Sequence, residues 1–563
     1  MNHYFSMPGI RFAPLALLPA LLSACGGSDS TDKPPVARQE IACERLADYA
    51  LQQDNVIAAS ASIAAGDDTI PTHCVVNLTE APNTEIHVVL PLNALDGGEG
   101  GSARGAWNGK VQNQGGGGYV GNLMPVAGPV RNGFVGSVTN AGHSPAWCNA
   151  LDPDTGLPNS QENCGLVNGG FVLDGNNDLV VSRVQTFIRD SLLAQTEWAL
   201  DLAEAYYAMP AERNYWTGCS TGGRQGFEMA QQYGDLFDGF LVGAPAMNWN
   251  RFIIGGTWPP VVARERLGAA GLDPARSAAA NAAAIAACDA DDGVVDGVIN
   301  EPRLCGFNAD SLICQGDGPD AATCLTPDEA FVVNAIWDGP RDELGRRLWG
   351  GLPKGVSFDT LLPGGVDPSV MMLTYLSNWM YQDPDYDWTQ VSEAQFYQHF
   401  EFSRSKYSGL AATDAVNLDA VRDSGAKIIH YHGLSDSLII PYGSYNYVGR
   451  VFEHYGQEAT QTFMRSFFFP GVGHCAGGAG AQPDTDEMFR VLQDWVEQGV
   501  APDYLVASGA PGNADATRKV CMYPDALQLA APAAPDDEAS YVCEPVDDIP
   551  EVLKEDARTF LDE

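Results

Sequence analysis

The chain has 563 residues, which suits one large catalytic domain with an inserted subdomain, or two to three ordinary domains. Its 72 acidic and 31 basic residues give a formal net charge of −41, which argues against nucleic acid as a partner and against docking on anionic lipid. Hydrophobic residues make up 45% and charged residues 18% of the chain, so the composition is that of a folded globular protein.

The N-terminal residues are predicted to be a targeting signal. An apolar run over 12–22 follows Arg11, and Leu22 at its end begins the sequence Leu-Ser-Ala directly before Cys25. A short apolar run before small residues is typical of a secretory signal rather than a membrane span. The motif resembles a bacterial lipobox, so we predict a lipoprotein signal peptide over 1–24, a lipid on Cys25 and a flexible tether over 25–39. The protein is then exported and anchored to the bacterial cell envelope, in the outer membrane, or secreted; the alternative is an ordinary signal peptide with an incidental cysteine.

The cysteine count fits an exported protein. There are 13 cysteines, and setting Cys25 aside leaves 13 − 1 = 12, enough for six disulfides. Local spacing suggests five pairs and leaves Cys219 and Cys475, which lie far apart in the sequence. The five pairs are Cys43–Cys74, Cys148–Cys164, Cys288–Cys305, Cys314–Cys324 and Cys521–Cys543.

Apolar patterns predict alternating strands and helices. We expect strands at 85–91, 214–217, 240–243, 427–431 and 462–469, helices at 184–208 and 222–233, and a glycine-rich loop within 111–121. This alternation favours an α/β fold with a mostly parallel sheet. The stretch 247–426 breaks the rhythm, so we predict an insertion there between two parts of one domain, 40–246 and 427–563.

A nucleophile motif lies between a predicted strand and a predicted helix. Gly218 to Gly222 reads G-x-S-x-G, the nucleophile elbow of α/β-hydrolases, in which Ser220 is the nucleophile. Glycines are needed because neighbouring side chains would clash in so tight a turn. We therefore predict an α/β-hydrolase fold.

A serine nucleophile needs a base and an acid, which follow it in the order Asp then His in this fold. Asp436 and His474 each follow a predicted strand, at the strand ends where α/β sheets place their chemistry. Three other histidines compete for the role of base. We expect His430 and His432, within a strand, to be core or wall residues, and His143, which precedes the nucleophile, to be structural.

Stabilising the oxyanion takes two backbone N–H donors. One is expected to be Thr221, directly after the nucleophile. The other is expected from the run Gly115 to Gly118, with Gly116 and Gly117 as the candidate donors. The alternative is that this run is only a flexible loop.

Several motifs together resemble the tannase/feruloyl esterase family, which includes mono(2-hydroxyethyl) terephthalate hydrolase. The resemblance covers about residues 40 to 545. It implies that Ser220, Asp436 and His474 form a triad, that Cys219 and Cys475 are bonded to each other, and that the insertion over 247–426 is a lid over the active site. The matching segments are 107–110 with the glycine run, 218–226, 237–239, 243–246, 432–436 and 470–475.

The resemblance also implies a structural Ca²⁺ site in the lid. Asp289, Asp292 and Asp296 would supply carboxylates, and Val294 and Val298 backbone carbonyls. Oxygen ligands suit a hard cation, although the spacing departs from an EF-hand. The alternative is a solvated acidic turn.

The expected substrate is a small aromatic ester. Eight aromatic residues of the lid could stack an aromatic acyl group, or simply form lid core. Arg404 and Lys406 do not align with a carboxylate clamp, so we expect a monomeric carboxylic ester hydrolase acting on phenolic esters through an acyl-enzyme. Alternatives are terephthalate monoester hydrolysis, a serine peptidase and a non-catalytic surface lipoprotein that binds phenolics. The aromatic residues are Trp379, Tyr381, Tyr386, Trp388, Phe396, Tyr397, Phe400 and Phe402.

Overall fold

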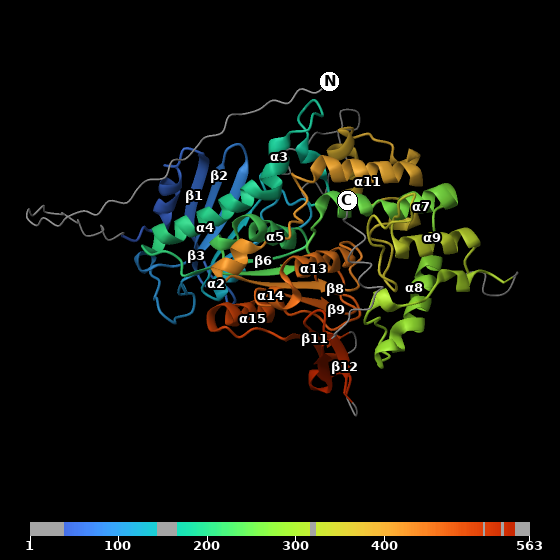
Figure 1. Ribbon diagram of the computed structural model, residues 1–563. Helices are drawn as coiled ribbons and strands as arrows, with labels where there is room; N and C mark the ends of the chain where they lie inside the picture. Colours follow the sequence, from blue (N-terminus) through green and yellow to red (C-terminus); the bar gives the residue numbers. More distant parts are fainter. Residues whose placement is uncertain (1–38, 144–165, 316–322, 511–512, 531–533, 546–563) are drawn as a thin grey trace, which may run out of the picture. The chain divides into compact units, whose positions relative to one another are not determined.

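The computed structural model describes residues 39–143, 166–315, 323–510, 513–530 and 534–545 (Figure 1). The predictions for the signal peptide, for Cys25 and for the pair Cys148–Cys164 lie outside these residues. From Gln39 onward the described chain belongs to one compact unit.

A mixed sheet of nine strands organises this unit, in the order β1-β2-β3-β5-β4-β6-β7-β8-β9. The first three strands and the β3–β5 pair are antiparallel, and every pair from β5 to β9 is parallel. Parallel neighbours bring their carboxyl ends to one edge, where the loops can meet. The strands are β1 (Val56–Ala64), β2 (His73–Glu80), β3 (Thr84–Pro91), β4 (Lys110–Gln114), β5 (Val135–Thr139), β6 (Arg213–Cys219), β7 (Gly239–Gly243), β8 (Lys427–Gly433) and β9 (Met464–Phe469).

Helices cover both faces of the sheet because its central strands are apolar on both sides. Trp216 and Phe240 pack with α5 and α13 on one face, whereas Tyr215 and Leu241, one position away, pack with α15 on the other. Helix α4 covers the N-terminal strands. These helices are α1 (Leu46–Ala50), α2 (Gly128–Arg131), α3 (Val181–Gln185), α4 (Ser191–Tyr207), α5 (Thr221–Tyr233), α13 (Tyr442–Tyr455), α14 (Gln457–Thr460) and α15 (Thr485–Gln498).

The predicted elements coincide with observed ones. The expected strands correspond to β3, β6, β7, β8 and β9, and the expected helix at 222–233 to α5. The predicted helix at 184–208 is α3, a π-helical stretch (Thr186–Asp190) and α4 in succession, ending where Ala208 takes a left-handed φ of 59°. Strands β1, β2, β4 and β5 were not predicted.

The segment between β7 and β8 carries seven helices among its described residues. Because β7 and β8 are direct parallel neighbours, with Gly239 opposite Lys427, the whole segment leaves and re-enters the sheet at adjacent strands. We call residues 247–426 the insert; its helices α7, α8, α9 and α11 gather beside the sheet (Figure 1). They are α6 (Trp249–Gly255), α7 (Trp258–Leu267), α8 (Pro274–Cys288), α9 (Pro327–Asp338), α10 (Val370–Thr374), α11 (Glu393–Tyr407) and α12 (Asp419–Ser424).

Aromatic side chains form the junction between the insert and the sheet. Tyr119, which follows the glycine run, lies 5.5 Å from Trp249 between ring centroids, and Trp249 lies 6.2 Å from Trp379. Trp379, Phe396 and Phe400 are buried in the same core. These three members of the aromatic stretch are therefore core residues of the insert.

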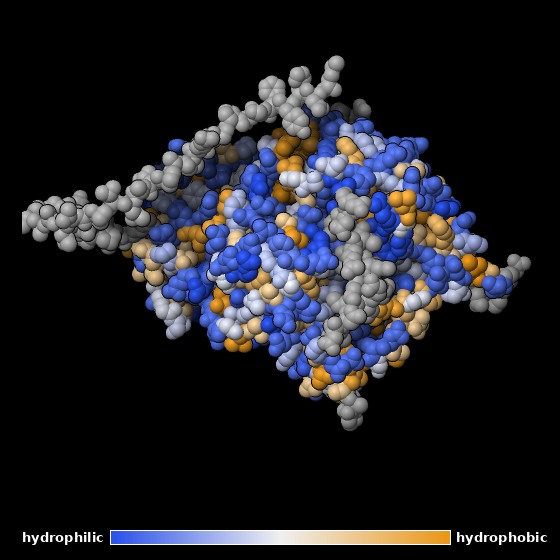
Figure 2. Space-filling model, viewed as in Figure 1, coloured by the Kyte–Doolittle hydropathy of each residue, from blue (hydrophilic) through white to orange (hydrophobic). Residues whose placement is uncertain are grey.

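Two short sheets follow α15: β10 (Tyr504–Ala510) with β11 (Asn513–Cys521), and β12 (Ala526–Leu529) with β13 (Tyr541–Glu544). Four of the disulfides predicted from spacing are present: Cys43–Cys74, Cys288–Cys305, Cys314–Cys324 and Cys521–Cys543. Among the described helices none is both long and apolar enough to cross a membrane. Hydrophilic residues cover most of the face in Figure 2, with hydrophobic ones in small groups.

Candidate active site

The predicted nucleophile, Ser220, lies in a strained turn between β6 and α5. Ser220 has φ 63° and ψ −128°, a backbone conformation that residues other than glycine rarely adopt and that often marks a functional site. A Cβ on Gly218 would lie 2.6 Å from the carbonyl carbon of Gly222, so the two glycines of the motif are needed for the turn to close. The Ser220 carbonyl accepts hydrogen bonds from the N–H groups of Arg224 and Ala246, which hold the turn.

The glycine run lies against the nucleophile because β4 is the parallel neighbour of β6. A Cβ on Gly115 would meet the Cα of Gly222 at 2.4 Å, so only glycine fits there. The Thr221 hydroxyl donates to the Gly118 carbonyl at 2.6 Å, which joins the two loops. This run is therefore a packed part of the site rather than a free loop.

The two predicted glycine donors differ in their hydrogen bonds. The Gly116 N–H donates to Gln225 Oε1 at 2.8 Å, so it is already engaged. The Gly117 N–H donates to none of the residues that the structure describes. Thr221 opens α5, where the first N–H groups have no partner within the helix. Thr221 and Gly117 therefore remain as the pair of candidate donors.

The acid and the base meet at the ends of β8 and β9. His474 Nδ1–H donates to Asp436 Oδ2 at 2.7 Å, and Asp436 Oδ1 accepts the N–H groups of Leu438 and Ile439 at 2.8 and 2.9 Å. Asp436 is fully buried. Burial opposes its ionisation, but the charge of His474 and the hydrogen bonds from His432 and His474 outweigh burial and lower the pKa of Asp436 to about 2. The carboxylate stays ionised and holds His474 with Nε2 left to take a proton.

The competing histidines are placed differently. His432 is buried and has both ring nitrogens engaged, one of them at Asp436 Oδ2, so it has none left for the nucleophile. His430 is buried among aromatic rings. His143 stacks on Phe171 at 3.7 Å, and burial lowers its pKa to about 3, so it is a neutral core residue. The sequence analysis did not predict the contact of His432 with Asp436. The four-residue spacing of the two residues across the end of a strand was the only sequence signal for it.

A disulfide joins the nucleophile side of the site to the histidine side. Cys219 and Cys475, adjacent to Ser220 and His474, are bonded with their Cα atoms 6.0 Å apart across 256 positions of sequence. The bond that the family resemblance implied is therefore present. It ties the end of β6 to the loop after β9, so the nucleophile and the base cannot drift apart as separate loops.

The acidic loop of the insert presents only oxygen donors, but they are not gathered around one point. Asp289 Oδ1 accepts the N–H groups of Asp296 and Gly297, and Asp296 Oδ2 accepts from Arg518 at 2.7 Å. Burial, together with the charges of Asp296 and Asp289, raises the pKa of Asp292. Within the described ranges no three His, Cys, Asp or Glu side chains are placed to hold one metal ion. The donor chemistry suits Ca²⁺, and the loop would have to tighten to bind it.

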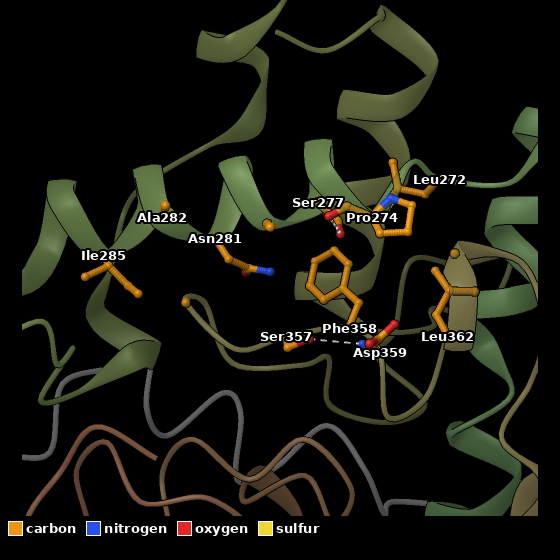
Figure 3. Close-up of a pocket in the computed structure, with 13 residues that line it drawn as sticks. Leu272, Pro274, Ser277, Asn281, Ala282, Ile285, Ser357, Phe358, Asp359 and Leu362 are labelled. Carbon is orange, nitrogen blue, oxygen red and sulfur yellow. Dashed lines mark hydrogen bonds between the residues drawn. The ribbon is translucent and has the colours of Figure 1, made fainter. Parts of the chain in front are cut away.

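The insert contains a cavity of about 390 Å³ that neither the acidic loop nor the predicted triad lines. It lies between α8 and the segment 355–365, and Asn281 and Phe358 point into it from the two sides (Figure 3). None of Ser220, Asp436 and His474 lines it. The cavity is therefore distinct from the predicted catalytic residues, and its one charged lining residue is Asp359.

A strained serine at a strand-to-helix turn, a buried Asp–His pair beyond later strands and a sheet covered on both faces define a serine hydrolase of the α/β-hydrolase fold. The chain matches the family model described as tannase and feruloyl esterase over residues 103–361 and 369–544. It therefore belongs to the tannase and feruloyl esterase family and is a carboxylic ester hydrolase.

Particular relatives agree with this membership. A probable feruloyl esterase of Arthroderma benhamiae is 32% identical over 433 residues, covering 74% of this chain and 77% of the relative. A probable feruloyl esterase B-1 of Aspergillus fumigatus is 29% identical over 412 residues, covering 67% and 74%.

Solved structures show the same fold. Feruloyl esterase B from Aspergillus oryzae superposes with a TM-score of 0.74 at 22% identity, covering 89% of this chain and 99% of that one. Tannin acyl hydrolase from Aspergillus niger gives 0.70 at 21% identity, covering 90% and 92%. The α/β-hydrolase fold expected from the sequence is confirmed.

Proposed function

We propose that the protein hydrolyses esters of phenolic aromatic acids, of the hydroxycinnamate or gallate type, through an acyl-enzyme on Ser220. The observation that carries the proposal is the Asp436–His474 pair, which the Cys219–Cys475 disulfide ties to the strained serine. The names of the relatives, feruloyl esterase and tannin acyl hydrolase, support the acyl class.

The residues act in a fixed sequence. Ser220 Oγ attacks the ester carbonyl carbon while His474 Nε2 takes the hydroxyl proton, and Asp436 stabilises the imidazolium. The N–H groups of Thr221 and Gly117 bind the oxyanion. As the intermediate collapses, His474 gives the proton to the leaving alcohol. His474 then takes a proton from a water molecule, which attacks the acyl-enzyme carbonyl. His474 returns this proton to Ser220 Oγ as the acid is released.

Two cations of the insert bear on the choice of acyl group. Arg404 pairs with Glu401 at 2.7 Å. Lys406 Nζ donates to the carbonyls of Trp379 and Met380, and burial lowers its pKa to about 8. Neither is poised to receive a free carboxylate, which favours a phenolic ester over the terephthalate monoester.

The test is turnover of methyl ferulate, methyl gallate and the terephthalate monoester by the wild type and by Ser220→Ala. We expect the phenolic esters to be preferred and the variant to retain less than about a thousandth of wild-type turnover, because loss of the nucleophile leaves only binding and oxyanion effects. Wild-type protein without any ester turnover would leave the non-catalytic binding protein as the better interpretation. Faster cleavage of the matching amide than of the ester would favour the peptidase.

We further propose that the acidic loop binds a structural Ca²⁺. Asp289, Asp292 and Asp296 would supply carboxylates and Val294 and Val298 carbonyls. Support comes from the oxygen-only donor set and from the mutual repulsion of the three carboxylates, which a divalent cation would relieve. The ion would stabilise the insert, and the hydrolysis uses only the residues described above.

We also propose that the protein is exported as a monomer and anchored by a lipid on Cys25. The lipobox-like motif and the disulfides, which persist in oxidising compartments, support this proposal. Mass spectrometry of protein from a bacterial host should find a lipidated Cys25 as the first residue. A Cys25→Ser variant should be released in soluble form; an unmodified wild-type N-terminus would refute the anchor.

A further inference from the structure

A second histidine touches the carboxylate that orients the base. His432 lies on β8, four residues before Asp436, and its side chain is fully buried. Its Nε2 lies 3.1 Å from Asp436 Oδ2 and 2.9 Å from the Ile439 carbonyl oxygen, and its Nδ1 lies 2.8 Å from Ser444 Oγ. The mechanism above does not use this residue.

The hydrogen-bond partners assign the tautomer of His432. A carboxylate oxygen and a carbonyl oxygen can only accept, so the nitrogen that faces both of them carries the proton. In the neutral ring Nδ1 is then an acceptor, and Ser444 is the donor to it. Ser444 thereby withdraws charge from the ring and strengthens the donation by Nε2–H.

From this network we infer that His432 is a positioning residue that acts on the base through Asp436, and this inference rests on the proposed esterase mechanism. Asp436 Oδ2 accepts from both His474 and His432, while Oδ1 accepts two backbone N–H groups. The four donors fix the plane of the carboxylate. The donation from His432 also removes negative charge from the oxygen that His474 senses.

Loss of that donation has two consequences. The carboxylate gains freedom to rotate, which misplaces His474. Its Oδ2 also carries more charge, so it binds the imidazolium of His474 more tightly and the base is protonated at a higher pH. A residue that served only packing would change the rate without moving the pH profile.

His430 offers a matched control. It lies on the same strand and the same face, is fully buried, and has no hydrogen-bond partner for either nitrogen among the residues that the structure describes. Its ring lies 6.4 Å from that of His432, and burial lowers its pKa. His432 thus has three polar or titratable neighbours: it contacts Asp436 and Ser444 directly, and its ring lies near that of His430. His474 contacts the same oxygen of Asp436.

The first experiment measures kcat and kcat/KM for para-nitrophenyl butyrate across pH in His432→Phe, His432→Gln, Ser444→Ala and His430→Phe. We expect His432→Phe to lower kcat roughly tenfold, within the range for a misplaced catalytic group, and to leave KM nearly unchanged. Its acid limb should move up by about half a pH unit. His432→Gln, which keeps a donor, should recover part of both effects, Ser444→Ala should shift the limb less, and His430→Phe should not shift it.

An acid limb in His432→Phe that coincides with the wild type would overturn the inference, as would an equal shift in His430→Phe. Where His432→Phe does not fold, Ser444→Ala decides. A second measurement needs no substrate: nitrogen-15 NMR of histidine-labelled wild-type protein should show His432 protonated at Nε2. The opposite tautomer would overturn the positioning role even if the protein is an esterase, whereas the expected tautomer without ester turnover would count only against the proposed function.

Discussion

Two groups of carboxylates in this protein show what a buried charge needs. Asp436 is fully buried, yet its pKa falls to about 2 because the charge of His474 and the hydrogen bonds from His432 and His474 outweigh burial. Asp292 is only half-buried, yet its pKa rises because burial and two neighbouring carboxylates oppose its ionisation. The charges and hydrogen bonds around a carboxylate therefore decide the direction of its pKa shift more than its degree of burial does. Asp436 is thus compensated by its neighbours, whereas the carboxylates of the acidic loop raise the pKa of Asp292, as would be expected of the Ca²⁺ site proposed there.

The two regions share one covalent feature. The Cys219–Cys475 disulfide flanks the triad, and the Cys288–Cys305 disulfide begins directly before Asp289. Each crosslink restrains a different site, so the two can be compared by removing one at a time. Substitutions and chelation can test whether the residues around Asp436 depend on preorganised hydrogen bonds and the acidic loop on a bound ion.

The largest effect should come from Asp436→Asn. Asparagine would turn an amide N–H toward the nitrogens of His474 and His432, which both donate to the carboxylate. His474 would then adopt the other tautomer and lose the free Nε2, so kcat should fall about 10⁴-fold, the scale known for such a replacement in serine proteases. The measurement is kcat for a chromogenic ester at neutral pH.

The stability of this variant provides its control. The folded-state pKa of Asp436 is about 2, below its ordinary value of 3.8, so the ionised carboxylate stabilises the fold at pH values above 3.8. This stabilisation is lost as the pH falls through the folded-state pKa. The wild type should lose on the order of 2 kcal/mol of unfolding free energy over that window, and Asp436→Asn should lose little of it. Equal acid sensitivity of the two proteins would contradict the assigned environment.

The next effect should come from removing the disulfide at the triad. Replacing Cys219 and Cys475 by alanine frees the histidine loop, and a displacement of about 1 Å can cost about a hundredfold in rate. We expect kcat to fall on that scale at temperatures where the variant is folded. Replacing Cys288 and Cys305 instead should leave kcat nearly unchanged. Two titratable thiols at 219 and 475 in the native protein, or an unimpaired double variant, would show that the bond has no part in the mechanism.

The smallest effect should be that of chelation on the acidic loop. A ligand that binds only the folded state stabilises it by about 2.7 kcal/mol at a hundredfold excess over its dissociation constant. EDTA should therefore lower Tm, and added Ca²⁺ should restore it. Asp292→Asn should abolish the Ca²⁺ response with kcat nearly unchanged. An identical Tm with EDTA and with Ca²⁺ would leave the loop as a solvated acidic turn.

The sequence alone determined the elements whose patterns are local. The elbow was readable because two glycines flank its serine between a predicted strand and a predicted helix. The strands that precede Asp436 and His474 were readable because they are short apolar runs. β1 was not readable, because it is rich in alanine and mostly exposed, and β5 was not, because all five of its residues, including a serine and a glycine, are buried between neighbours. In such strands the pairing partners rather than the residues decide the structure.

The tertiary structure decided what depends on segments far apart in the chain. Sequence order predicted Ser220, Asp436 and His474 as the triad but did not decide between Gly116 and Gly117 as the second oxyanion donor. The hydrogen bond from Gly116 to Gln225, seen only in the structure, favours Gly117. Likewise, residue type made His430 and His432 equivalent core histidines. Among the described residues His430 has no hydrogen-bond partner, whereas His432 contacts Asp436. A side chain's chemistry is set by its residue type, but its protonation and its role are set by the donors and acceptors that folding brings within about 3 Å.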